Sequence, residues 1–541
     1  MRRRKYCGSR AGVHNRGKCG IITPMKRTGS LKREYAGRLV ALFLAVSPLA
    51  VTARLRPNIV FILADDLGFG DVGFQPFAQA NVLARLRTPG LARLAEGGVT
   101  LTAHYAAAPV SAPSRASLIT GRVQGACSLR DNCFDRAFTE TNTLASVLRG
   151  VGYATWAVGK WGVAGGGESR EPVSSHPLDR GFDYFYGFLD HLAGHTYYHY
   201  RGHLNNAFMG ITENRTDATD SAIGIYSTDL FVAKAKQLVA RHAATRPDTP
   251  FFLYLAVNTI HGSGRDNPTL KTKKPLHVPG RPYPTQGISW PLAPEPLDAR
   301  NTWIEPAYRA LPEPAARYAT AISRLDDALA DFLRELDRLG IARDTLVVFT
   351  SDNGPADEYG ADPRAFASTG PFDGLKRDVF EGGLRVPAIV RWPARLASGQ
   401  TDAAPSQFHD WMATLADAAG ATCPPESEGV SLLPRWRGWA AGCTVPPAPS
   451  FVYVQYEFPW DGHSETFRAF KTRKAPVRGL QQMVRVGDYV ALRTRMREDP
   501  ARTRLYNVVR DPFEAHDLSK RPEEQTRMRA LTAILDERRR P

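Results

Sequence analysis

Three short apolar runs alternate along the chain with stretches of helical periodicity. Residues 58–64, 251–257 and 345–350 are continuous and apolar, as expected for parallel strands that are buried on both faces. Apolar residues at helical spacing occur between these runs, at residues 91–96, 143–149, 228–241 and 317–339. Strands that alternate with helices predict an α/β fold, in which helices sandwich a large, mixed but mostly parallel sheet.

The pattern changes in the C-terminal part of the chain. Proline and glycine are frequent in residues 424–449. Short strand-like pieces and a helical stretch follow, at residues 451–458, 482–486, 489–494 and 522–540. They predict a smaller α+β subdomain with an antiparallel sheet and a terminal helix. We therefore divide the chain into an N-terminal extension, a large domain and this subdomain, at residues 1–53, 54–435 and 436–541.

The formal net charge of +16 is concentrated at the N-terminus. Residues 1–53 hold twelve Lys and Arg and one acidic residue, so the rest of the chain carries only +5. This distribution argues against nucleic acid as a partner. Basic residues precede an apolar run at 39–49 and small residues at 51–53, the pattern of a signal peptide. We expect a periplasmic or secreted protein with no stable membrane insertion after signal removal; an uncleaved membrane anchor is the alternative.

The cysteines are compatible with export. Cys7 and Cys19 fall in the N-terminal extension, which leaves an even number: Cys127, Cys133, Cys423 and Cys443. Their spacing suggests two local disulfides, one within each close pair, in an oxidising compartment. The alternative is four free thiols.

Polar side chains follow each apolar run. Asp65 and Asp66 come after the first run, His261 soon after the second, and Asp352 and Asn353 after the third. Ligands of α/β sheets bind beyond the carboxyl ends of the strands, so these side chains are candidates for one site. The three carboxylates and the amide are hard oxygen ligands that suit one Ca²⁺ or Mg²⁺. Each pair taken alone is also typical of an ordinary turn.

Residues 111–122, SAPSRASLITGR, could simply begin a helix, with Ser111 as its cap. The whole string resembles the signature of the sulfatase family, in which Cys or Ser precedes x-Pro-Ser-Arg and then Leu-x-Thr-Gly-Arg. Four further segments resemble that family in the same order, at residues 58–68, 159–161, 374–387 and 505–514. The resemblance extends over roughly residues 55–520 and implies an alkaline phosphatase-like fold.

The resemblance also implies roles for single residues. It implies a Ca²⁺ site, with Mg²⁺ less favoured, formed by Asp65, Asp66, Ser111, Asp352 and Asn353. A maturation enzyme that acts on serine would oxidise Ser111 to formylglycine, whose hydrate is the nucleophile. Arg115 would hold this hydrate beside the metal. Lys160 and Lys376 would bind the sulfate oxygens of a sulfated small molecule or saccharide, and His261 would lie at the leaving oxygen.

One position departs from the family pattern. Many sulfatases continue the Gly-Lys-Trp segment with His, which assists release of sulfate, whereas this chain has Gly162. Another base is therefore expected, and His195 is the first candidate, followed by His104 and His191.

Two other functions fit parts of the sequence. A phosphate-ester hydrolase or transferase would use unmodified Ser111, but such enzymes usually bind two metals and carry His where this chain has Asn353. A non-catalytic binding protein of the same fold would explain Gly162 but not the intact set of metal and sulfate ligands.

The substrate surface is expected to include residues 262–314, a long irregular stretch. This stretch carries a basic patch that could contact a polyanionic sugar or remain a solvated loop, namely Lys271, Lys273, Lys274, His277 and Arg281. Four aromatic residues could stack on sugar rings or pack in the protein, namely Tyr197, Tyr198, Trp290 and Trp303.

Overall fold

The structure is a computed structural model, and ten segments of the chain are described in it. They are residues 56–75, 85–131, 136–166, 173–204, 207–223, 225–262, 304–357, 362–443, 451–457 and 479–539. The predicted signal peptide, Cys133, the basic patch at 271–281, Trp290 and Trp303 lie outside these residues. Among the described residues, no helix has the length and apolar composition needed to cross a membrane.

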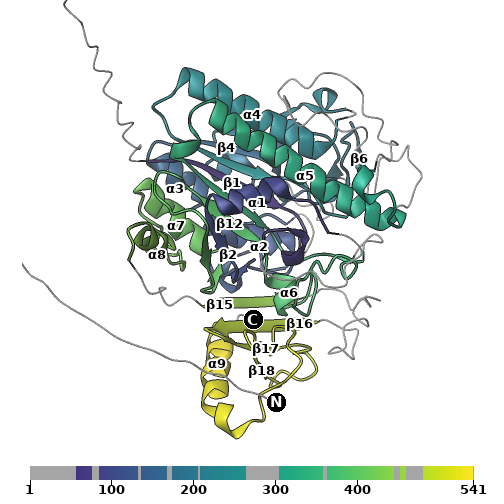
Figure 1. The fold of residues 1–541 in the computed structure, drawn as a ribbon, viewed down its shortest axis with the longest axis vertical. Coiled ribbons are helices and arrows are strands. Elements are labelled where there is room, and N and C mark those ends of the chain that lie inside the picture. Colours follow the sequence, from purple (N-terminus) through teal and green to yellow (C-terminus); the bar gives the residue numbers. More distant parts are fainter. Residues whose placement is uncertain are drawn as a thin grey trace, which may run out of the picture. The chain divides into compact units, whose positions relative to one another are not determined.

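A ten-stranded mixed sheet forms the centre of the large domain (Figure 1). Its strand order is β13-β2-β12-β11-β1-β10-β4-β5-β8-β9. The five central strands are parallel to one another, namely β11 (Thr345–Ser351), β1 (Asn58–Ala64), β10 (Phe251–Ala256), β4 (Ala154–Lys160) and β5 (Tyr184–Phe188). The outer strands are β13 (Gln400–Asp402), β2 (Val99–Leu101), β12 (Ala388–Arg391), β8 (Thr212–Glu213) and β9 (Thr216–Asp217). The predicted mostly parallel α/β sheet is therefore confirmed.

Helices cover both faces of this sheet (Figure 1). The α1 (Pro89–Glu96), α4 (Ser227–Thr245) and α5 (Glu313–Arg338) helices share a core with Val60 and Ile62 of β1. The α2 (Ser111–Thr120), α3 (Leu144–Gly150), α7 (Asp410–Ala419) and α8 (Leu433–Ala440) helices share a second core with Ile59 and Phe61. Successive strand residues point to opposite faces, which is why an unbroken apolar run such as β1 suits a sheet covered on both sides.

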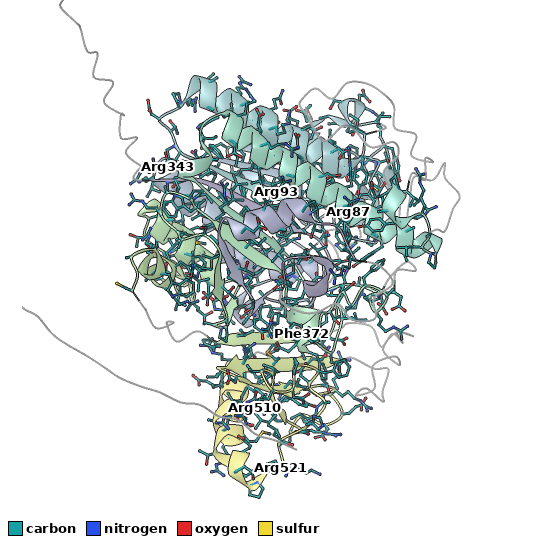
Figure 2. The ribbon with its side chains drawn as sticks, viewed as in Figure 1. Arg87, Arg93, Arg343, Phe372, Arg510 and Arg521 are labelled. Carbon is teal, nitrogen blue, oxygen red and sulfur yellow. The ribbon has the colours of Figure 1, made fainter. Side chains whose placement is uncertain are left out.

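The C-terminal residues form a separate antiparallel sheet. Its order is β15 (Val452–Glu457), β16 (Leu480–Val486), β17 (Tyr489–Arg493) and β18 (Arg504–Asn507). The α9 helix (Gln525–Arg538) packs on one face through Leu531 and Leu535, while α6 (Glu381–Leu384) lies beside the sheet (Figure 1). In Figure 2, Arg521 marks the far end of this subdomain, Arg510 lies within it, and Phe372 marks its junction with the large domain. The predicted small C-terminal sheet and terminal helix are confirmed, while the residue numbers of the domain boundaries stay predictions.

Four two-residue strands complete the strands of the described residues: β3 (His104–Tyr105) pairs with β14 (Ser406–Gln407), and β6 (His203–Leu204) pairs with β7 (Ala207–Phe208).

The two predicted disulfides are wrong in this structure. Cys127, Cys423 and Cys443 are free thiols. Cys127 is buried, and its Sγ lies 3.7 Å from Thr120 Oγ1 and 3.8 Å from the Arg122 carbonyl. Cys443 is exposed beyond the end of α8, where its Sγ approaches the Ala441 carbonyl. Close spacing in sequence does not fix the mutual orientation that a disulfide requires.

Candidate active site

The candidate residues converge because their four strands are neighbours in the sheet. Asp65 follows β1, Asp352 follows β11, Lys160 ends β4, and residues 258–261 follow β10. These strands are adjacent and parallel, so their carboxyl ends open onto one edge. Helix α2 begins at the same edge with Ser111.

Ser111 lies between the polar residues of two strands. Its Oγ donates a hydrogen bond to Asp65 Oδ1 at 3.0 Å and lies 3.3 Å from Asn353 Oδ1. All three side chains are buried. The signature serine is therefore in direct contact with the side chains that the sequence assigned to the metal.

Two lysines and one arginine balance the carboxylates. Lys160 Nζ donates to Asp65 Oδ2 at 2.5 Å, and Lys376 Nζ donates to Asp66 Oδ2 at 2.8 Å. Arg115 lies one helical turn after Ser111 on α2, and its Nε and Nη2 both donate to Asp352 Oδ2, at 3.0 and 2.7 Å. These six residues bring three acidic and three basic side chains together out of contact with water.

Burial and the neighbouring charges act in opposite directions on this cluster. Burial alone would raise the pKa of Asp65, but the charges of Lys160, Arg115 and Lys376 outweigh it and lower that pKa to about 2. Burial and the charge of Asp65 raise the pKa of Asp352 to about 6, against the opposing effect of Arg115. Burial also lowers the pKa of the Lys160 ammonium, although Asp65 opposes this shift. Closely spaced carboxylates with such divergent pKa values are typical of functional sites.

The oxygen donors fit a hard divalent cation. The four side chains after β1 and β11 supply only carboxylate and amide oxygens, and no sulfur or nitrogen ligand lies among them. The Asp66 backbone N–H donates to Asp352 Oδ1 at 3.2 Å, and Asn353 Nδ2 donates to Asp66 Oδ1 at 2.7 Å. These two hydrogen bonds connect the carboxyl ends of β1 and β11. Calcium is bound by oxygen sets of this kind, whereas zinc prefers nitrogen and sulfur.

A cluster of three histidine rings lies beside the acidic residues. The centroid of the His261 ring is 4.4 Å from that of His195 and 5.5 Å from that of His191, and the latter two are 5.2 Å apart. His261 Nε2 also lies 3.8 Å from Asp66 Oδ2. Within the described residues, neither ring nitrogen of His261 has a hydrogen-bond partner. Burial, with the charges of Lys376 and Lys160, holds the pKa of His261 well below its usual range.

His195 is presented by a short 3₁₀ helix, η5 (Leu192–His195). Its Nδ1 lies 2.9 Å from the Gly262 carbonyl, which can only accept, so Nδ1 carries the proton and Nε2 is left as the basic atom. Asn258 fixes the position of η5 by donating to the Gly194 and Thr196 carbonyls, at 3.3 and 3.1 Å. The sequence reasoning missed Asn258, although its position directly after the β10 run could have indicated it.

The other histidine candidate is used elsewhere. His104 Nδ1 contacts Ser406 Oγ at 2.9 Å, and its Nε2 accepts a hydrogen bond from Trp411 Nε1 at 3.0 Å. Both ring nitrogens therefore have structural partners, which removes His104 as a substitute base. His191 remains close to His195 and His261.

The structure around Gly162 disfavours a side chain at the position where many sulfatases have His. It has a φ of 71°, and a Cβ at this position would lie 3.3 Å from Lys160 Cε. A side chain would therefore be strained and would press on the lysine. Gly194 lies over the same lysine, since a Cβ there would be 3.5 Å from Lys160 Nζ. The η5 segment thus covers Lys160.

The two described aromatic candidates belong to the core. Tyr197 is fully buried, and its hydroxyl donates to the Asn258 and His261 carbonyls, at 3.2 and 3.0 Å. Tyr198 is also buried, and both rings pack against Tyr226. Tyr197 therefore contacts the backbone that carries His261, and neither buried ring is exposed for stacking on a sugar.

Comparison with known proteins places this geometry in context. The family model described as Sulfatase matches residues 57–421. Steryl-sulfatase of Mus musculus is 32% identical over 457 residues, which cover 74% of this chain and 69% of the relative. N-acetylgalactosamine-6-sulfatase of Mus musculus is 28% identical, with 74% and 70% covered.

Solved structures share the fold. The crystal structure of Ps i-CgsB in complex with k-i-k-neocarrahexaose has a TM-score of 0.65 at 23% identity, covering 89% of this chain and 92% of that chain. The PsFucS1 sulfatase from Pseudoalteromonas sp. has a TM-score of 0.59 at 20% identity, covering 89% of each chain.

Proposed function

The chain belongs to the sulfatase family and is an enzyme that hydrolyses sulfate esters, and we propose that it does so with an aldehyde formed from Ser111 beside one bound calcium ion. The observation that carries this proposal is the position of Ser111 Oγ, 3.0 Å from Asp65 Oδ1 and 3.3 Å from Asn353 Oδ1. A nucleophile made from this side chain would stand at the proposed metal ligands, among three cationic side chains.

The modified residue and the metal each supply one kind of chemistry. When formed, the hydrated aldehyde offers one hydroxyl to attack sulfur and a second that expels sulfate after losing its proton. When bound by Asp65, Asp66, Asp352 and Asn353 together with the modified Ser111, calcium would withdraw charge from the sulfate group.

The remaining residues bind, orient and move protons. Lys160 and Lys376 are compact charges at the carboxylate cluster, placed to bind the sulfate oxygens and stabilise the charge that develops on them. Arg115 is fixed by Asp352 and holds the nucleophile in position. Lys376 is the candidate for giving a proton to the departing alcohol, and an N–H of His261 can donate a hydrogen bond to the oxygen of that alcohol.

His195 is our candidate for the base that releases sulfate. Its Nε2 is the unprotonated ring atom, and its ring lies 4.4 Å from that of His261. It would take the proton of the second hydroxyl, the step that many sulfatases assign to the His replaced here by Gly162.

The proposed substrates are sulfate esters of carbohydrates, or aryl sulfates. Relatives named steryl-sulfatase and N-acetylgalactosamine-6-sulfatase cover about three quarters of this chain, which supports a sulfated ring alcohol without choosing between a sugar and a steroid. We further propose that the protein acts in the periplasm or outside the cell, and that it depends on a maturase that accepts serine.

Mass spectrometry of the tryptic peptide at residues 94–115, from protein made in its native host, tests the modification. We expect a loss of two hydrogens at Ser111. Protein that hydrolyses sulfate esters with an unmodified serine would refute the aldehyde mechanism and leave the hydroxyl itself as the nucleophile. As a control, a Ser111→Ala protein should show neither the mass change nor activity.

A further inference from the structure

The three-histidine cluster has the composition of a metal site that differs from the calcium site. His191, His195 and His261 each offer one ring nitrogen, and these atoms lie within 4.8 Å of one another. Imidazole nitrogen is a ligand for zinc and similar borderline metals, whereas calcium prefers oxygen. We propose that this cluster is a second metal site, which binds one Zn²⁺ through the three imidazoles and leaves a fourth position open.

His261 provides the independent observation that points to a ligand. Its side chain is fully buried, and within the described residues both of its ring nitrogens lack a hydrogen-bond partner. A buried polar atom without a partner costs on the order of 1–3 kcal/mol, so such atoms usually mark a site that a ligand completes. The ring packs against the other two histidine rings, and its Nε2 lies 3.8 Å from Asp66 Oδ2.

The orientation of His195 also suits a metal ligand. Its Nδ1 donates to the Gly262 carbonyl at 2.9 Å, which makes Nε2 the unprotonated ring nitrogen, the form that binds a metal. Ligating histidines commonly donate their second ring nitrogen to a carbonyl or carboxylate in this way, because that bond fixes the tautomer and the ring orientation. The Asn258 side chain holds the η5 segment that presents His195.

The cluster requires only small adjustments to bind a metal. Three nitrogens around tetrahedral zinc lie roughly 3.4 Å apart, because Zn–N bonds are about 2.0–2.1 Å long. Nitrogens that lie within 4.8 Å of one another would have to approach by at most about 1.4 Å, which we expect rotation of the rings to supply. His195 is half-buried while His191 and His261 are buried, so the open fourth position is expected on the side of His195. Burial also favours the neutral imidazoles that metals bind.

Charged side chains near the three histidines affect how strongly the cluster binds a cation. Asp66 lies beside His261 and favours a cation, while Lys160 and Lys376 disfavour one. The histidine site should therefore be weaker than an isolated three-histidine site, and it should still prefer zinc to calcium because its ligands are nitrogen.

Direct binding to tag-free protein, saturated with calcium, tests the site without using turnover. We expect one Zn²⁺ per chain by competition with a chromophoric chelator, and X-ray absorption showing three nitrogen ligands at about 2.0–2.1 Å. His191→Gln should lower zinc affinity roughly 100-fold or more, because a ligand is lost. The matched control is His203→Gln, an exposed histidine outside the cluster, which should bind zinc as the wild type does.

Other outcomes would overturn the proposal. Zinc binding that is abolished by calcium, or that is unchanged in His191→Gln, would place the ion on the carboxylates or on the surface. An absorption spectrum with mainly oxygen ligands would do the same. If His191→Gln does not fold, the zinc affinity of His195→Gln and the absorption spectrum of the wild type test the site instead. Unchanged affinity in His195→Gln, or mainly oxygen ligands in the spectrum, would overturn the proposal.

Inhibition by zinc is a consequence that rests on the proposed function, because His195 and His261 would then be occupied. It is measured separately, on protein whose Ser111 conversion has been verified. Zinc binding without inhibition would refute the catalytic role of these histidines and leave the metal site standing. Inhibition without binding at the cluster would refute the metal site alone.

Discussion

Asp66 illustrates at the scale of one residue how the site is organised. Its φ of 62° lies in the left-handed region, which costs a non-glycine residue on the order of 1 kcal/mol. This conformation turns the chain directly after β1, so that adjacent Asp65 and Asp66 both reach the site. Asp65 contacts Ser111 and Lys160, while Asp66 contacts Asn353 and Lys376.

The role of His195 gives the first prediction at this scale. His195→Ala should lower kcat by roughly 100-fold or more, the usual contribution of a positioned general base. Steady-state kinetics on protein with verified Ser111 conversion measures this, with His203→Ala as the exposed control. Near-normal kcat in His195→Ala would remove it from the mechanism.

Calcium binding gives the second prediction. Calcium should raise the thermal midpoint of the wild type, because a ligand that binds only the folded state contributes about 2.7 kcal/mol at 100 times its Kd. Chelation should reverse the shift, and Asp352→Asn should lose most of it because one charged ligand becomes neutral.

The control for this prediction is Asp326→Asn. Asp326 is a buried carboxylate that caps α1 through Gly90 and Leu91, away from the proposed ligands. Its variant should keep the full calcium-dependent shift in thermal midpoint. An equal shift in Asp352→Asn would show that calcium binds elsewhere.

At the scale of elements, α2 is the platform that fixes two functional residues. Ser111 begins the helix and Arg115 follows one turn later, so a single rigid element sets their separation. Every residue of α2 is buried, although its apolar residues do not form one clear stripe. The helix ends at Gly121, whose φ is 68° and whose added Cβ would lie 2.5 Å from Met412 Cβ on α7.

This helix end gives the third prediction. Gly121→Ala should lower the free energy of unfolding by about 2–4 kcal/mol, because left-handed strain is added to overpacking against Met412. Gly420→Ala is the matched control: Gly420 ends α7 with a φ of 65°, but no atom lies within 4 Å of an added Cβ. Chemical denaturation of both variants isolates the packing contribution, and equal losses would contradict it.

At the scale of the whole molecule, a buried ionic network joins the C-terminal subdomain to the segment that carries Lys376. Glu381 accepts from Tyr105 at 2.7 Å and from Arg385 at 2.9 Å, and Arg485 of β16 lies 3.6 Å from it and contacts the same tyrosine. The Arg385 guanidinium also lies 4.4 Å from the ring of Phe372, which Figure 2 labels at this junction. The C-terminal sheet thereby fixes the backbone beside Lys376.

This network gives the fourth prediction. Arg485→Leu should lower the free energy of unfolding by about 3–5 kcal/mol, because it leaves Glu381 buried with one cationic partner fewer. Arg497→Leu removes an exposed pair with Glu457 and should cost much less. Denaturation curves of the two variants provide the comparison. Similar losses would mean that the buried network stabilises the fold no more than an exposed ion pair does.

The sequence by itself determined the elements that are set by local patterns. Mostly apolar runs identified β1, β10 and β11 to within one residue, since a strand buried on both faces has few polar positions. The same runs placed Asp65 and Asp352 at strand ends, and the signature string identified Ser111 and Arg115. The sequence missed β4, whose Thr155 and Gly159 interrupt the apolar pattern, and it reached Lys160 only through the family resemblance.

Only the tertiary structure decided which distant residues meet. The order β11-β1-β10-β4 depends on how the helices pack on the sheet, and this order brings His261 beside Asp66. The fold of the η5 segment decided that His191 and His195 join His261, while His104 is held by Trp411. Local sequence patterns record whether a position is buried, but they do not record its neighbour across the fold, because that contact depends on the path of the whole chain.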